Sequence, residues 1–220
     1  MQVIYACDIG TTRGPKPKFA WVRMKQSRPK ICKGSHDIEE LAQHLAEDMK
    51  KGFNIALGFE APLFIPIPMS ANDLSKARIG EGNRAFAAPT GLAVTTLAIH
   101  QTAWLLDRLR TQIPENYHLT LDWHDWGVHS KGPILFLWEA FVSGDAHSLT
   151  DMEDAATAAA AFCEKDNDFG KGNRVTCYRA LSLIGTAILW SGISKDLAFL
   201  KNKCLVIKPD VRIECSIAAT

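Results

Sequence analysis

Residues 3–10 read Val-Ile-Tyr-Ala-Cys-Asp-Ile-Gly, and this apolar run predicts a buried β-strand over Gln2–Ile9. Two more strands are expected directly after it, over Phe19–Met24 and around Pro29–Lys33. The stretch from Gly10 to Lys18 is rich in glycine, proline and lysine, which is typical of a hairpin-like turn. The first part of the chain is therefore expected to form three strands in succession.

An amphipathic helix is expected next, from about Ile38 to Lys51. Its apolar residues recur on one face, and Asp37 followed by Glu40 resembles a capping box. The segment Asn54–Phe59 is nearly all apolar, as the buried strands of parallel sheets are. Three strands, a helix and a strand in this order imply an antiparallel meander followed by one crossover. The predicted fold class is α/β, with a mixed sheet and helices packed on both faces.

The rest of the chain is expected to alternate between irregular segments and shorter elements. Residues 62–68 contain three prolines that lead the chain out of the sheet, and residues 70–91 are polar enough to predict a loop. Further helices are expected over Ala93–Arg110, residues 151–164 and Tyr178–Ser191, and further strands over His118–Trp123, Ile134–Phe141 and Cys204–Lys208. A length of 220 residues fits one domain, or a core with a helical insertion.

Composition and charge limit the classes of protein to which this chain can belong. It is 47% hydrophobic and 22% charged, which supports a sizeable core and excludes global disorder. A net charge of +1 excludes a strongly basic footprint, although it is compatible with a local basic groove beside an acidic site.

The cysteines and the apolar segments indicate the compartment. The six cysteines show no Cys-x-x-Cys spacing, and no leader peptide or bilayer-length apolar stretch is recognisable. We therefore expect a cytoplasmic protein with reduced thiols and no membrane association. Composition does not fix the oligomeric state, and a homodimer is compatible with it.

Four acidic residues stand out because they fall at the ends of predicted elements. Asp8 ends the first strand, and Glu60 ends the apolar run Asn-Ile-Ala-Leu-Gly-Phe-Glu. Asp151 and Asp154 open the alanine-rich helix and share one of its faces, because they are three residues apart. Each has a plain structural explanation: a turn at the glycine after Asp8, an ion pair of Glu60 with an arginine, and the usual preference of acids for helix starts.

The four residues together indicate a metal site. A carboxylate at the end of a buried strand is costly unless it is paired, solvated or bound to a cation. The small residues of the alanine-rich helix would let its two carboxylates approach the strand ends closely. Carboxylate oxygens favour Mg²⁺ or Mn²⁺, and two such ions about 3.5–4 Å apart are a common device for phosphodiester cleavage. We therefore expect Asp8, Glu60, Asp151 and Asp154 to converge on divalent metal.

The order of these motifs resembles the RNase H-like superfamily and, within it, the RuvC-type Holliday-junction resolvases. It also resembles an uncharacterised family of predicted nucleases, the domain of unknown function four-two-nine. The shared motifs are Asp8–Gly10 (Asp-Ile-Gly), the aromatic second strand Phe19–Val22 and Glu60–Leu63 (Glu-Ala-Pro-Leu). An arginine-containing stretch from Arg78 to Arg84 and the sequence Asp151–Ala155 (Asp-Met-Glu-Asp-Ala) complete the resemblance, which spans most of the chain.

This resemblance implies a fold, an activity and a partner. The fold would be a single RNase H-like domain over residues 1–220, with a five-stranded mixed sheet and a helical and loop insertion at about 64–130. The activity would be that of a nuclease that uses Mg²⁺ or Mn²⁺ on nucleic acid, with the four carboxylates as its catalytic metal ligands. Lys76, Arg78 and Arg84 could hold the scissile phosphate or its neighbours, unless they form only a solvated loop face.

Two other functional classes fit parts of the sequence. Residues 8–12 (Asp-Ile-Gly-Thr-Thr) also resemble the first phosphate loop of sugar kinases and actin-like ATPases. Those proteins need a second Asp-Gly loop and an adenosine motif, which we do not find in the sequence. A non-catalytic nucleic-acid-binding domain with an RNase H-like core is the third alternative, and the near-neutral charge is in keeping with it.

Three further features leave alternatives open. Glu139 interrupts an apolar strand and could be a metal ligand or a member of a structural ion pair. His124, Asp125 and His129 could bind zinc, although a packed aromatic loop explains this Trp- and Gly-containing stretch better. His147 lies in a predicted surface loop, from which it could approach the carboxylates.

Overall fold

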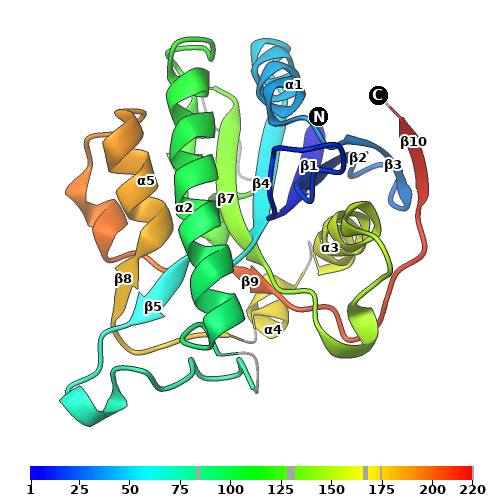
Figure 1. Ribbon diagram of the computed structural model, residues 1–220. Helices are drawn as coiled ribbons and strands as arrows, with labels where there is room; N and C mark the ends of the chain where they lie inside the picture. Colours follow the sequence, from blue (N-terminus) through cyan, green and yellow to red (C-terminus); the bar gives the residue numbers. More distant parts are fainter. Residues whose placement is uncertain (83–84, 128–131, 166–167, 174, 220) are drawn as a thin grey trace.

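The first three strands form the expected antiparallel meander (Figure 1). They are β1 (Gln2–Asp8), β2 (Ala20–Lys25) and β3 (Ile31–Ser35). The middle of β1 is buried because both faces of the sheet are covered, which explains its continuous apolar sequence. The computed structural model describes residues 1–82, 85–127, 132–165, 168–173 and 175–219.

The helical crossover after the meander lies where the sequence predicts it. Helix α1 (Ile38–Lys50) begins at Asp37, whose side chain accepts hydrogen bonds from the backbone N–H groups of Glu39 and Glu40. Strand β4 (Asn54–Glu60) then pairs parallel with β1. Strand β7 (Ile134–Ala140) pairs parallel with β4, so the centre of the sheet is parallel and one flank is antiparallel.

The sheet has eight strands among the described residues, so the prediction of five was too small. Its order is β10-β3-β2-β1-β4-β7-β6, and β9 also pairs with β7. Three short outer strands account for the difference: β6 (His118–Thr120), β9 (Val206–Ile207) and β10 (Ser216–Ala219). The sequence predicts longer strands at the first two and none at the third, because the ends of these strands are set by pairing with distant strands.

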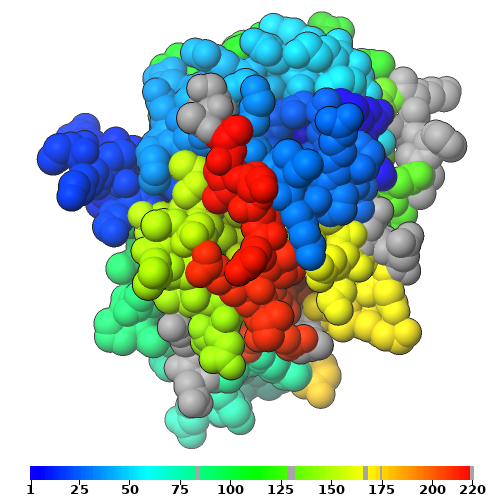
Figure 2. Space-filling view, turned by 90° about the vertical axis from the view of Figure 1, so that its right-hand side faces the viewer, coloured from blue at the N-terminus to red at the C-terminus, as the bar shows by residue number. Residues whose placement is uncertain are grey.

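The C-terminal segment lies across helix α3 (Asp151–Lys165) before it reaches the edge of the sheet, and it is red in Figure 2. The guanidinium of Arg212 lies 2.7 Å from a carboxylate oxygen of Glu153. The hydroxyl of Thr157 donates to the carbonyl oxygen of Ile213 at 3.5 Å. Strand β10 then pairs parallel with β3. This segment therefore holds α3 against the sheet.

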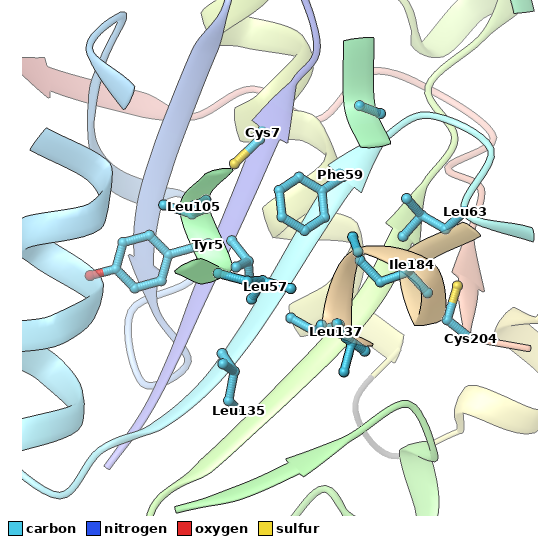
Figure 3. Close-up of a cluster of buried hydrophobic side chains, with 14 of the residues drawn as sticks. Tyr5, Cys7, Leu57, Phe59, Leu63, Leu105, Leu135, Leu137, Ile184 and Cys204 are labelled. Atoms are coloured by element: carbon cyan, nitrogen blue, oxygen red, sulfur yellow. The ribbon is translucent and has the colours of Figure 1, made fainter. Parts of the chain in front are cut away.

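Helices cover both faces of the sheet (Figure 1). Helices α1, α2 (Pro89–Arg110) and α5 (Leu183–Ser191) pack on one face, over a core that includes Tyr5, Leu57 and Leu137 (Figure 3). The alanine-rich helix α3 packs on the other face, where its six buried alanines allow a close approach. Within the described ranges, no helix combines the length and apolar character that crossing a bilayer requires.

The segments beyond the sheet differ in detail from the sequence-based expectation. Strands β5 (Phe64–Pro66) and β8 (Ala180–Ser182) form a separate antiparallel pair that the sequence did not predict. The predicted helix over Tyr178–Ser191 is therefore wrong at its start: Ser182 caps α5, and β8 precedes it. The remaining elements are short: η1 (Ala71–Asp73), η2 (Trp123–Asp125), η3 (Gly144–Ala146), α4 (Phe169–Gly172) and η4 (Leu197–Leu200).

Candidate metal centre

Two of the four predicted carboxylates lie side by side because of the strand register. In the parallel pair of β1 and β4, Asp8 is the direct partner of Glu60. Both residues end their strands at the same edge of the sheet, and both are half-buried. The backbone hydrogen bonds of the two strands therefore fix the spacing between these two carboxylates.

The third carboxylate comes from the opposite face. Asp154 lies in the first turn of α3 and is only 2% exposed. Its Oδ1 accepts a hydrogen bond of 2.6 Å from the backbone N–H of Ser148. Its Oδ2 lies 2.6 Å from Nδ1 of His147, so the loop before α3 orients this side chain.

Asp8, Glu60 and Asp154 together form a group with the chemistry and spacing of a metal site. Each offers one carboxylate oxygen, and these three atoms all lie within 4.8 Å of one another. Hard oxygen donors at this spacing suit a divalent cation such as Mg²⁺, Mn²⁺ or Ca²⁺. Among the described residues, this is the one group of three or more potential ligands at such a spacing. The residues fit a divalent ion.

Burial and nearby negative charges both disfavour the ionised form of Asp8. Burial, followed by the charges of Asp151 and Asp154, raises the pKa of Asp8 from 3.8 to about 8. A hydrogen bond from the backbone of Ile9 and the charge of Lys18 oppose this rise. The carboxylates therefore repel one another, and a bound cation would relieve the repulsion.

This raised pKa predicts how stability depends on pH without metal. Between about pH 4 and 8, folded Asp8 keeps a proton that the unfolded chain has released. The contribution of Asp8 to the free energy of unfolding should therefore fall as the pH rises through this window. We expect Asp8→Asn to be more stable than the unaltered protein by about 1–3 kcal/mol at pH 8, and by much less at pH 4. Denaturant unfolding in EDTA at both pH values measures the difference; equal slopes with pH for both proteins would contradict it.

The fourth predicted ligand, Asp151, lies near the group but is not part of it. Its charge acts on Asp8, yet one of its carboxylate oxygens lies 3.8 Å from Nζ of Lys18, and its side chain is partly exposed. The structure therefore brings three of the four carboxylates within reach of one cation and places the fourth beside a lysine.

The prediction that Arg78 binds phosphate is wrong, because Arg78 is buried. Its side chain is fully buried, and its guanidinium binds Glu81 at 2.9 Å and Glu139 at 2.7 Å. Glu139 also accepts a hydrogen bond of 2.9 Å from the backbone N–H of Leu63. Of the two alternatives for Glu139, the structural ion pair is therefore the correct one.

The other two predicted phosphate ligands have different outcomes. Lys76 is exposed, and its Nζ lies 3.9 Å from a carboxylate oxygen of Asp73. Arg84 lies outside the described residues.

The His-containing loop after β6 forms local contacts. Nδ1 of His124 lies 2.6 Å from Oδ1 of Asp122, and the His124 ring stacks on Trp123 at a centroid distance of 3.6 Å. Asp125 accepts a hydrogen bond of 2.5 Å from the hydroxyl of Thr120. These contacts agree with a packed aromatic loop, whereas His129 lies outside the described residues.

A cavity of about 460 Å³ adjoins the carboxylate group. Glu60 lines it, together with Ala61 and Pro62 after β4, the first turns of α2 and residues 140–142 at the end of β7. Its walls are mostly apolar, and its size falls within the range of small-ligand sites.

Sequence reasoning missed two contributors to this site. The backbone N–H of Ser148 leaves no signal in the sequence, because any residue supplies one. Lys18 had a signal, since it belongs to a basic stretch directly after Asp8. His147, for which the sequence left open an approach to the carboxylates, contacts Asp154.

Comparisons with known protein families, with curated proteins and with solved structures each find no match to this chain.

Proposed function

We propose that this protein is a metal-dependent phosphodiester hydrolase, a nuclease that uses Mg²⁺ or Mn²⁺. One observation carries the proposal: carboxylates from three separate segments, Asp8, Glu60 and Asp154, meet within 4.8 Å. Burial, followed by the charges of Asp151 and Asp154, raises the pKa of Asp8, so ionised Asp8 is unfavourable in the folded protein unless a cation is bound.

The strand order supports an RNase H-like core for this function. Strands β3, β2, β1, β4 and β7 are neighbours in that order, the first three are antiparallel, and β4 and β7 are parallel to β1. The resemblance implies a five-stranded mixed sheet whose first three strands are antiparallel, and these five strands are compatible with it, with β6, β9 and β10 as additions at the edges. The segment between β4 and β7 would then be the expected insertion.

The residues of the site would divide the work as follows. Asp8, Glu60 and Asp154 would hold the ion. Asp151, whose charge acts on Asp8, would contribute to a second ion after leaving Lys18. When bound, Mg²⁺ or Mn²⁺ would acidify a nucleophilic water and stabilise charge on the leaving oxygen. His147 and the N–H of Ser148 orient Asp154.

Metal binding is the first test. We expect saturating Mn²⁺ or Mg²⁺ to stabilise the protein by about 3 kcal/mol at a hundredfold excess over the Kd. Glu60→Gln and Asp154→Asn should lose most of this stabilisation, because each removes one anionic ligand. Thermal unfolding with and without the ion measures it, and Glu47→Gln on the exposed face of α1 is the matched control.

Two results would count against the proposal. Stabilisation by the ion that is the same in Glu60→Gln and the unaltered protein would place the ion elsewhere. Stabilisation by ATP, without any cleavage of DNA or RNA, would favour the phosphotransfer class instead.

A further inference from the structure

Charge is distributed unevenly along the chain, in a way that the net charge conceals. The whole sequence has 25 basic and 24 acidic residues. Residues 9–36 contain no acidic residue at all, but eight basic ones: Arg13, Lys16, Lys18, Arg23, Lys25, Arg28, Lys30 and Lys33. This run covers β2, β3 and the turns on either side of β2.

The strand register places the exposed basic residues of the two turns at opposite ends of the sheet, while Arg23 in β2 pairs with Asp48. Asp8 pairs with Ala20, whereas Val3, at the other end of β1, pairs with Lys25. The hairpin Thr11–Lys18 is therefore at the end of the sheet that carries the carboxylates. The turn that contains Arg28 and Lys30 is at the other end, about 17 Å further along β2.

The hairpin Thr11–Lys18 is firmly held at its base. The carbonyl oxygen of Thr11 accepts hydrogen bonds from the N–H groups of Lys18 and Phe19, at 2.8 and 3.0 Å. Nε2 of Gln101 in α2 donates to the carbonyl oxygen of Gly10 at 2.6 Å. A Cβ at Gly10 would lie 2.5 Å from the backbone of Lys18, so only glycine permits this close approach.

The tip of the hairpin is open to solvent. Arg13 and Lys16 are exposed, and Gly14 between them has a positive φ of 96° with nothing within 4 Å of a Cβ built there. In Figure 2 this segment is the blue lobe that projects beside the lime-coloured start of α3. The tip thus presents cations that no other part of the described chain covers.

The hairpin also adjoins the carboxylate centre directly. Nζ of Lys18 lies 3.8 Å from Asp151, and its charge acts on Asp8. A group of carboxylates repels a phosphate backbone, so a metal centre that cleaves one needs cations nearby to attract the flanking phosphates. Arg13, Lys16 and Lys18 are in the position to supply them.

We propose that the hairpin Thr11–Lys18 binds the phosphate backbone of a nucleic acid next to the carboxylate centre. Arg13 and Lys16 contact phosphates that flank the bond to be cleaved, and Lys18 exchanges Asp151 for a phosphate. This inference rests on the proposed nuclease function and deepens it, because it names the surface that takes the substrate. The phosphate-binding role that the sequence predicted for Arg78, which is buried, is thereby assigned to exposed cations of the hairpin.

Binding without cleavage tests the surface separately from the catalysis. A fluorescent oligonucleotide of mixed sequence, single-stranded or duplex, is titrated with protein in EDTA, and anisotropy is followed over a range of salt concentrations. Arg13→Ala with Lys16→Ala is compared with Arg28→Ala with Lys30→Ala, which removes the same charge from exposed positions at the far end of the same strands. Lys16→Glu is a second hairpin variant, and circular dichroism checks the folding of each.

The hairpin double variant should bind about tenfold more weakly, and the slope of log K against log salt should fall by about 1.4–1.8, the value for two lost phosphate contacts. Lys16→Glu should weaken binding at least as much, and the distal double variant should change it less than twofold. Equal effects of the two double variants would overturn the proposal, as would binding to anionic phospholipid vesicles but to neither oligonucleotide.

The proposed function can fail independently of this inference. If the hairpin variants lose binding but Mn²⁺ neither stabilises the protein nor permits cleavage, the surface stands and the nuclease activity falls. If the metal-dependent cleavage is present and the hairpin variants cleave with unchanged KM at every salt concentration, the hairpin inference falls.

Discussion

Asp8→Asn and Glu60→Gln are each expected to lower metal-dependent cleavage of nucleic acid by about a thousandfold or more. Each change removes one anionic ligand of the three that meet within 4.8 Å, and the electrostatic role of a catalytic divalent ion is worth several kcal/mol. Both substitutions keep the size of the side chain, so the strand pairing of β1 with β4 should persist. Cleavage of labelled DNA and RNA with Mn²⁺, measured as initial rates, checks this expectation.

The control for this experiment is a carboxylate that the centre does not use. Glu153 lies in the same first turn of α3 as Asp154, but its side chain pairs with Arg212 at 2.7 Å, so the control variant is Glu153→Gln. It should cleave within a few-fold of the unaltered protein. Undiminished cleavage by purified Asp8→Asn would show that the activity does not come from this centre.

Arg78→Met is expected to destabilise the fold by about 3–5 kcal/mol, the usual cost of breaking a buried ion pair from one side. The guanidinium binds both Glu81 and Glu139, and all three side chains are buried. Without it, two carboxylates are left in an apolar environment. Burial already raises the pKa of Glu139, and Arg78 opposes that rise, so the loss of Arg78 must raise it further.

The raised pKa of Glu139 also makes the loss of stability in Arg78→Met depend on pH. A carboxylate with a raised pKa in the folded state becomes less favourable as the pH rises, so Arg78→Met should lose more stability at pH 8 than at pH 5. Urea unfolding at the two pH values measures it. Arg108→Met, at a half-exposed position in α2, should change stability by less than about 0.5 kcal/mol, and Glu139→Gln in the Arg78→Met background should restore part of the loss. A cost under about 1 kcal/mol at pH 8 would contradict the structural role.

The parts of the fold that the sequence predicted well are those with strong local patterns. The apolar run at 3–10, the amphipathic face of α1 and the alanine-rich stretch of α3 are each long enough to be recognised locally, and the structure confirms each element within a few residues. Strands β5, β8 and β10 have only three or four residues each, too few to show a period. They form because a distant segment supplies hydrogen-bond partners for their backbone, and local sequence patterns do not reveal such long-range pairing.

The residues of the site were likewise predicted where they carry a local signal in the sequence and missed where they do not. Asp8, Glu60 and Asp154 could be singled out because acids at element ends are unusual in apolar surroundings, and the strand register then brings the first two together. Arg78 was misjudged because its partner Glu139 is 61 residues away in the sequence. A polar loop composition gave no sign that one arginine within it would be buried.

The centre takes two ligands from the sheet and one from a helix. Asp8 and Glu60 move as a unit, since one hydrogen-bonded ladder carries both, while Asp154 approaches on a helix whose contact surface is built from methyl groups. The separation between helix and sheet therefore sets how far Asp154 lies from the other two ligands. Alanine-to-valine exchanges along that surface offer a route to retuning ion selectivity without touching a single ligand.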